Sequence, residues 1–163
     1  MPKMILDRTD RRILEQLQTD GRLSNQELAE RVLLSPSPCL RRVRALERSG
    51  VIQLYAAVLD PLRVGLELLA YVTVKLEKRG KMPVDQFTRA VQSWPEVIAC
   101  FSMTGDMDYL MRVQVEDLAH YSRFIMDKLL KQPGVIDIRS NFVLERIKDT
   151  TALPLAHLVR ADR

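Results

Sequence analysis

Cysteine, histidine and long apolar runs are all scarce in this chain of 163 residues. The two cysteines, Cys39 and Cys100, lie far apart, with no CxxC pair and no histidine cluster nearby, so neither a disulfide framework nor a zinc site is indicated. No apolar run approaches the roughly 20 residues that a membrane-spanning helix needs, and the N-terminus lacks the plan of a secretory signal. We expect a cytoplasmic protein that binds no metal and no membrane.

The motifs that most enzymes carry are also missing. The sequence contains no nucleophile–base pair, no metal-ligand cluster, no P-loop and no dinucleotide-binding glycine motif. The two histidines, His120 and His157, have no acid or cysteine positioned beside them in the sequence, so we expect surface or packing roles for both. We therefore predict no catalytic residues, no cofactor and no enzymatic activity.

The charge balance permits nucleic-acid binding without demonstrating it. The net charge is +4 and the pI is about 9.3. Residues 1–60 hold ten Lys and Arg against eight Asp and Glu, and the remainder holds fifteen against thirteen, so the excess is spread evenly. A content of 47% hydrophobic and 28% charged residues is ordinary for a globular protein. Any argument for DNA binding must therefore come from local placement of charge.

Residues 1–52 have the signals of a three-helix DNA-binding domain. Asp7 and Asp10 have the spacing of an N-cap and a first-turn acid, both favourable at the positive end of a helix. Ser24 and Glu27 form a capping-box pattern at the start of a second helix. A short break then precedes Ser35-Pro36, which offers an N-cap followed by proline at the first position of a third helix.

The third helix concentrates positive charge on one side. Residues 35–48 hold four arginines and one acid, and at 100° per residue the basic and apolar side chains separate onto opposite faces. Guanidinium groups pair with guanine edges and clamp phosphates in the major groove. A solvated basic face is the alternative interpretation, but two short capped helices joined by a tight break favour DNA contact. The residues predicted to contact DNA are Ser35, Ser37, Pro38, Arg41, Arg42 (on the flank of the stripe), Arg44 and Arg48.

Two runs of the sequence resemble the Lrp/AsnC family of feast/famine regulators. They read LDRxDRxIL at residues 6–14 and LSPSPCLxRVxxLExxGxI at residues 34–52, and the resemblance extends over nearly the whole chain. One departure is Leu33, where members of the family often carry the turn glycine, so that a positive φ there would strain the backbone. The resemblance implies a transcription regulator that controls genes of amino-acid metabolism in response to a small effector.

Residues 67–163 are predicted to form a second domain, joined to the first by an extended connector at 53–66. Strand-like runs occur at 68–77, 97–104, 109–115 and 136–147, and two helical stretches lie between them. The order β-α-β-β-α-β is that of the ferredoxin-like fold. We therefore expect an α+β protein in which a winged helix-turn-helix precedes a ferredoxin-like domain. The helical stripes are Val84, Phe87 and Val91 in the first, and Leu118, Tyr121, Ile125 and Leu129 in the second.

This predicted sheet is apolar in both phases, although two helices cover only one face. Exposed apolar surface on that scale usually marks an interface, so we expect two copies to stack as a homodimer, and the resemblance implies further assembly, often to octamers. The tail is expected to pack against a neighbour through Leu153, Leu155 and Leu158. The second-phase residues are Leu69, Tyr71, Ile98, Cys100, Leu110, Val143 and Ile147.

Residues 105–109 form a loop with two possible roles. From spacing alone it is a hairpin turn with an Asp at a turn position. The resemblance instead implies an amino-acid site between dimers, where Asp106 or Asp108 would hold the α-ammonium and the glycine turn the α-carboxylate. Ser140 is a further candidate, although a satisfied sheet serine is the simpler interpretation. The residues predicted to bind the effector are Met103, Gly105, Asp106, Met107, Asp108, Tyr109 and Ser140.

The predicted function is therefore sequence-specific binding of double-stranded DNA, controlled by a small effector such as an amino acid. The alternative is a DNA-compacting architectural protein without ligand control. The two hypotheses share every feature of the N-terminal domain, and they differ only at the loop of residues 105–109.

Overall fold

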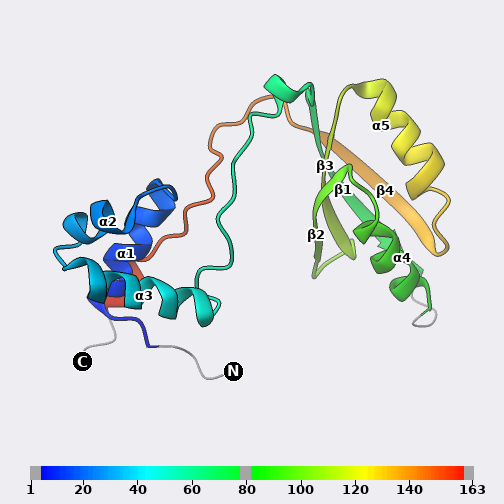
Figure 1. Ribbon diagram of the computed structural model, residues 1–163. Helices are drawn as coiled ribbons and strands as arrows, with labels where there is room; N and C mark the ends of the chain where they lie inside the picture. Colours follow the sequence, from blue (N-terminus) through cyan, green and yellow to red (C-terminus); the bar gives the residue numbers. More distant parts are fainter. Residues whose placement is uncertain (1–4, 78–81, 160–163) are drawn as a thin grey trace. The chain divides into compact units, whose positions relative to one another are not determined.

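The computed structural model describes residues 5–77 and 82–159, which form two compact units (Figure 1). Unit 1 comprises the chain up to Val58 together with the segment after Ile147, and unit 2 is Leu59–Ile147. Each unit has its own cluster of buried apolar side chains. Within the described ranges, no helix is both long and apolar enough to cross a membrane.

Unit 1 contains three helices, α1 (Arg8–Thr19), α2 (Asn25–Arg31) and α3 (Pro36–Arg48), as the sequence predicts. A capping box starts α1: the N–H of Asp10 donates to Asp7 Oδ1 at 2.8 Å, and the N–H of Asp7 donates to Asp10 Oδ2 at 3.1 Å. The predicted box of Ser24 and Glu27 starts α2. These reciprocal bonds satisfy backbone N–H groups that have no partner inside the helix.

The three helices share a core to which Cys39 contributes a fully buried side chain. The turn between α2 and α3 contains Leu33 with φ 58°. This is the left-handed conformation, in which a residue other than glycine strains the backbone. The Leu33 side chain is 82% exposed, so the strain is not offset by a gain from burying an apolar side chain. The core residues are Ile13, Leu14, Leu28, Ala29, Val32, Cys39 and Leu46.

Unit 2 has the predicted β-α-β-β-α-β order and one antiparallel sheet, with strand order β2-β3-β1-β4. A short 3-10 turn, η1 (Leu62–Val64), precedes β1. The helix α5 continues as a π-helical turn, η2. The elements are β1 (Leu68–Leu76), α4 (Met82–Gln92), β2 (Val97–Ser102), β3 (Tyr109–Val115), α5 (Leu118–Phe124), η2 (Ile125–Leu129) and β4 (Val135–Phe142).

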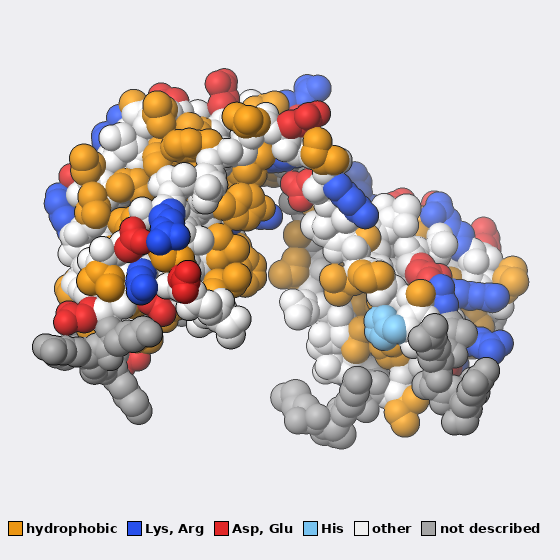
Figure 2. Space-filling view, turned by 180° about the vertical axis from the view of Figure 1, so that it is seen from behind, with side chains coloured by type: hydrophobic (Ala, Val, Ile, Leu, Met, Phe, Trp, Pro, Cys, Tyr) orange, Lys and Arg blue, Asp and Glu red, His pale blue; other side chains and the backbone are white. Residues whose placement is uncertain are grey.

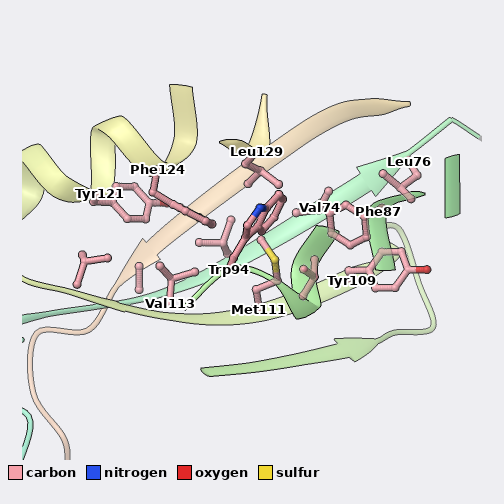
Figure 3. Close-up of a cluster of buried hydrophobic side chains, with 14 residues drawn as sticks. Val74, Leu76, Phe87, Trp94, Tyr109, Met111, Val113, Tyr121, Phe124 and Leu129 are labelled. Carbon is pink, nitrogen blue, oxygen red and sulfur yellow. The ribbon is translucent and has the colours of Figure 1, made fainter. Parts of the chain in front are cut away.

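The helices α4 and α5 cover one face of this sheet and enclose the core of unit 2 (Figure 3). Aromatic rings fill the space between the layers: Trp94 makes edge-to-face contacts with Phe87 and Phe124, with ring centroids 6.4 and 5.5 Å apart. Alternate residues of β1, from Ala70 to Leu76, point into this core as predicted. Edge-to-face pairs of this kind stabilise a core beyond the area that they bury.

Several predicted side-chain directions are wrong. A register shift between Val97 and Ala99 turns β2, so that Cys100 packs against the core rather than on the opposite face. On the helices, Val84 and Leu118 are exposed although the sequence places both on buried stripes. Each stands in the first turn of its helix.

The last strand is shorter than predicted. β4 ends at Phe142, and one further bond, from the Val143 N–H to the Leu69 carbonyl, closes the ladder. Beyond it Leu144 is 99% exposed and Ile147 is exposed, so neither is part of a sheet face. The chain leaves β1 at this point, and periodicity alone gives no signal for such a departure.

The tail packs against its own chain and belongs to unit 1, whereas the sequence placed it in the second domain. The Leu153 N–H donates to Gln18 Oε1 at 2.6 Å, and Gln18 Nε2 donates to the Leu153 carbonyl at 3.2 Å. Leu155 contacts the core of unit 1, and η3 (Ala156–Val159) follows it. Both backbone groups of Leu153 are thus held by a single side chain of α1.

Candidate DNA-binding surface and effector loop

The helix α3 exposes one polar face and buries the other. Ser37, Arg41, Arg44 and Arg48 are exposed, whereas Cys39 and Leu46 on the opposite side are fully buried. We call these four exposed residues the arginine face. Ser35 and Pro38 lie at the start of the same helix, where Ser35 occupies the N-cap position without making a side-chain cap bond. The 3.6-residue period places the arginines together because α3 is regular over its whole length.

Arg42 has a different environment from the one predicted for a DNA contact. Its Nη1 donates to Asp7 Oδ2 at 2.7 Å and to Asp10 Oδ1 at 2.8 Å, which ties α3 to the start of α1. The two carboxylates raise the pKa of Arg42, mainly through the hydrogen bond to Asp10. This guanidinium is therefore engaged within the chain, a pairing that the predicted DNA contact did not include.

The single acid of α3 is also paired. The Tyr55 hydroxyl, from the connector, donates to Glu47 Oε1 at 3.1 Å, and the Tyr55 ring lies beside Gly21. Burial, followed by the Glu47 carboxylate, raises the pKa of Tyr55. The bond holds the first part of the connector against unit 1.

Asp108 is bonded to the backbone of unit 2 through its carboxylate and its own backbone groups. Its Oδ2 accepts from the Leu76 N–H at 2.8 Å, its own N–H donates to the Val74 carbonyl at 3.0 Å, and its carbonyl accepts from the Met103 N–H at 2.8 Å. These bonds close the end of the β2–β3 hairpin onto β1. The structure thus gives the carboxylate of Asp108 a backbone partner, which the predicted effector role did not include.

Two other residues predicted to bind the effector are engaged in packing. The Tyr109 ring is buried, 4.7 Å from the Phe87 ring between centroids (Figure 3), and burial raises its pKa. The Ser140 hydroxyl accepts from the Tyr121 hydroxyl on the helix-covered side of the sheet. The loop therefore leaves Met103, Gly105 and Asp106 exposed, with Met107 half-buried; Gly105 has φ 118°, which favours glycine.

One charged cluster was missed from the sequence, where His120 was expected to lack a partner. Glu96, nearly buried, accepts from Lys128 Nζ at 2.6 Å, and His120 Nε2 lies 3.6 Å from the same carboxylate oxygen. Burial raises the pKa of Glu96, but the Lys128 ammonium outweighs it and the net shift is downward. In the described part of the chain, no group of three or more acids, histidines or cysteines could hold a metal ion.

Each of the two units matches a family of known proteins. Residues 6–53 match the family described as winged helix-turn-helix DNA-binding, and residues 69–153 match the Lrp/AsnC ligand binding domain. The leucine-responsive regulatory proteins of Escherichia coli (strain K12) and Salmonella typhimurium are 45% identical over 93% of this chain and 93% of theirs.

The chain belongs to the Lrp/AsnC family. It is a transcription regulator with a DNA-binding helix-turn-helix and a ligand-binding domain, and it is not an enzyme.

Two solved structures of similar proteins each match nearly the whole length of this chain. A transcriptional regulator from Neisseria meningitidis, in complex with L-Met, has a TM-score of 0.92 and 49% identity, and covers 94% of this chain and 99% of its own. An AsnC family regulator from Agrobacterium tumefaciens has a TM-score of 0.89 and 38% identity, over 94% and 100% of the two chains.

The bonds of Asp108 predict how this Lrp/AsnC regulator responds to changes in the loop. Asp108→Ala should lower the free energy of unfolding of unit 2 by about 1–3 kcal/mol, because it leaves the Leu76 N–H without its acceptor. Urea denaturation followed by the fluorescence of Trp94, the single tryptophan, measures it. The matched change Asp106→Ala, in the same loop but exposed, should stay within about 0.5 kcal/mol of the parent. Equal stability of the two variants would contradict a structural role for Asp108.

Proposed function

We propose that this Lrp/AsnC regulator binds the major groove of double-stranded DNA through the arginine face of α3, and that a free amino acid bound at the β2–β3 loop controls it. The observation that carries the first part is the contrast within α3. Arg42 is ion-paired inside the chain, whereas the described residues include no ion pair to Arg41, Arg44 or Arg48. Three uncommitted guanidinium groups on one short helix suit base edges and phosphates.

Substitutions on the arginine face test this proposal. Arg41→Ala should weaken binding to sequence-selected DNA by about 1–3 kcal/mol if Arg41 reaches a base edge. Arg48→Ala should weaken binding to all sequences similarly and reduce the slope of log K against log[salt] by about one, as the loss of a phosphate contact does. Mobility shifts on selected and random DNA at several salt concentrations measure both.

Arg89→Ala is the matched control, since it removes an exposed arginine from unit 2. We expect no more than a small change in either affinity for this variant. Negligible losses for both Arg41→Ala and Arg48→Ala would contradict the proposed reading face.

The exposed part of the β2–β3 loop supports the proposed effector site. Asp106 offers a carboxylate for an α-ammonium, the Gly105 turn offers backbone N–H groups for an α-carboxylate, and Met103 and Met107 supply an adaptable apolar wall. The Neisseria meningitidis relative was solved as a complex with L-Met, which supports an amino acid as the chemical class. Asp108, Tyr109 and Ser140 are expected to shape the site through packing rather than to touch the ligand.

Calorimetry with the twenty amino acids, followed by Asp106→Asn, tests the effector site. The variant should bind the effector more weakly while its unfolding and its DNA affinity without ligand stay unchanged, because Asp106 is exposed. Asp127→Asn, an exposed acid on the helical layer, should bind as the parent does. Ligand and DNA should affect each other reciprocally, by about 1–3 kcal/mol. Unchanged ligand affinity in Asp106→Asn would place the site elsewhere, and no binding of any amino acid would favour the architectural alternative.

We also propose that the regulator is a homodimer in which two copies stack through the outer face of the sheet, and that these dimers assemble further, to an octamer. This face is the side opposite α4 and α5, and in the register of the sheet it carries Leu69, Tyr71, Phe101 and Leu110. Hydrophobic side chains form broad areas on the surface of unit 2 (Figure 2). Exposed apolar side chains on a face that no described helix covers suit contact with another copy of the chain.

Light scattering of the full chain tests the assembly. Phe101 is 55% exposed on the outer face, and Phe101→Glu should shift the mass toward a monomer because it would bury a charge at the interface. Met126 is 60% exposed on the helical layer, so Met126→Glu should leave the mass unchanged. A parent chain that is monomeric at micromolar concentration would contradict the proposal.

The cellular role follows from these parts. We propose that the regulator acts on genes of amino-acid metabolism, because an amino-acid effector reports the state of that metabolism. We also propose that it acts in the cytoplasm, because a DNA-binding regulator needs access to the DNA that it controls.

A further inference from the structure

We propose that Arg42 is a positioning residue for DNA recognition: held by Asp7 and Asp10, it sets the rotation of α3 about its axis and so the direction of the arginine face. This inference rests on the proposal that the arginine face binds DNA. It replaces the direct DNA contact that the sequence predicts for Arg42.

All four oxygens of the two carboxylates are used in one closed arrangement. Asp7 Oδ1 and Asp10 Oδ2 accept the backbone N–H groups that start α1, at 2.8 and 3.1 Å. Asp7 Oδ2 and Asp10 Oδ1 accept from the same Nη1 of Arg42, at 2.7 and 2.8 Å. The capping box therefore orients both carboxylates without the help of Arg42. Arg42 thus binds a preorganised pair of acceptors at a fixed place on α1.

Burial makes this arrangement more demanding than an ordinary surface ion pair. The Asp10 side chain is only 7% exposed, and that of Arg42 is 34% exposed. A nearly buried carboxylate needs a counter-charge, and Arg42 is the cation that meets it. For Asp7, burial raises the pKa, but the Asp10 N–H and the Arg42 guanidinium outweigh it and lower the pKa overall. The acid is thus held in the charged form that binds Arg42.

The apolar core does not supply the same constraint. Cys39, Val43 and Leu46 keep the apolar side of α3 against α1 and α2, but the hydrophobic effect is non-directional, so small rotations of the helix cost little burial. Arg42 follows Arg41 in the helix, so its pinned direction sets the direction of Arg41 about 100° away around the axis. A charged contact with defined geometry on the flank of α3 limits its rolling, and a roll would turn every member of the arginine face away from its target together.

Removing the partner of Arg42 distinguishes a positioning role from a direct phosphate contact, because the two roles predict opposite changes in DNA affinity. In Asp10→Asn a phosphate-binding Arg42 would be released and a negative charge lost, so DNA binding would tighten and become more salt-dependent. A positioning Arg42 would lose its anchor, so binding to selected DNA would weaken. The exchange keeps the shape of the side chain and an oxygen that can accept the Asp7 N–H.

The experiment uses the full chain, a DNA fragment enriched from a random pool by the parent protein, and random-sequence DNA as the second probe. The variants are Arg42→Gln, Asp10→Asn and the conservative Arg42→Lys. We expect the first two to lose about tenfold or more in affinity for selected DNA, to stay within about twofold on random DNA, and to keep the parent's salt slope. Arg42→Lys should recover part of the loss, because an ammonium restores the charge but not the guanidinium geometry.

Two controls identify a loss that comes only from lower stability. Arg11→Gln breaks the 2.6 Å pair with Glu15, which lies within α1 and does not reach α3. Ile13→Val removes a methylene group from the core of unit 1 without touching the acids. Both variants should keep the parent's ratio of affinity for selected DNA to affinity for random-sequence DNA. The affinities are measured at a temperature well below the unfolding transition seen by circular dichroism.

Three results would overturn the inference. The first is tighter DNA binding by Asp10→Asn, and the second is an equal loss of affinity for selected and random DNA, with a shallower salt slope, in Arg42→Gln. The third is an equally large fall in the ratio of the two affinities in Ile13→Val. Failure of the proposed function is visible without any variant, because the parent protein would then enrich no sequence from the pool, and the inference would fall with it.

Discussion

Asp10 places a carboxylate in the interior of a small three-helix unit, where an unpaired charge would cost several kcal/mol. The Arg42 guanidinium and the backbone N–H of Asp7 both donate to that carboxylate, so the start of the first helix and the middle of the third are joined. Helix capping and the presentation of the arginine face therefore depend on the same carboxylate. The two residues that cap α1 therefore also hold α3 in place.

A comparable sharing of roles occurs in the ligand-binding domain. The β2–β3 loop carries the exposed groups that suit an amino acid, yet Asp108 and Tyr109 in the same loop fasten it to β1 and to the aromatic core. A loop anchored in this way presents Asp106 and the Gly105 turn with little freedom, and preorganisation of that kind lowers the entropic cost of binding a small ligand.

Both segments that leave unit 1 are attached to it by specific side chains. Tyr55 joins the connector to Glu47 on α3, and Gln18 on α1 holds both backbone groups of Leu153 in the tail. The continuation of β4 therefore ends on the helix whose N-terminus carries Asp7 and Asp10. The ligand-binding domain is thus linked by covalent chain at both of its ends to segments that contact α3 or α1.

Local patterns determined much of this protein without reference to its fold. The caps of α1 and α2, the extent of α3, the exposed arginines and the order of strands and helices follow from neighbouring residues, because capping and periodicity act within a few positions. The tertiary structure decided what periodicity does not encode. The pairing of Arg42 with Asp7 and Asp10, of Asp108 with Leu76, and of Lys128 with Glu96 each joins residues more than 30 positions apart. The side of the sheet on which Cys100 lies was decided by one register shift in β2, and the partner of the tail by a glutamine on α1. These outcomes depend on which surfaces meet when the elements pack, and that is settled by long-range contact rather than by the local order of residues.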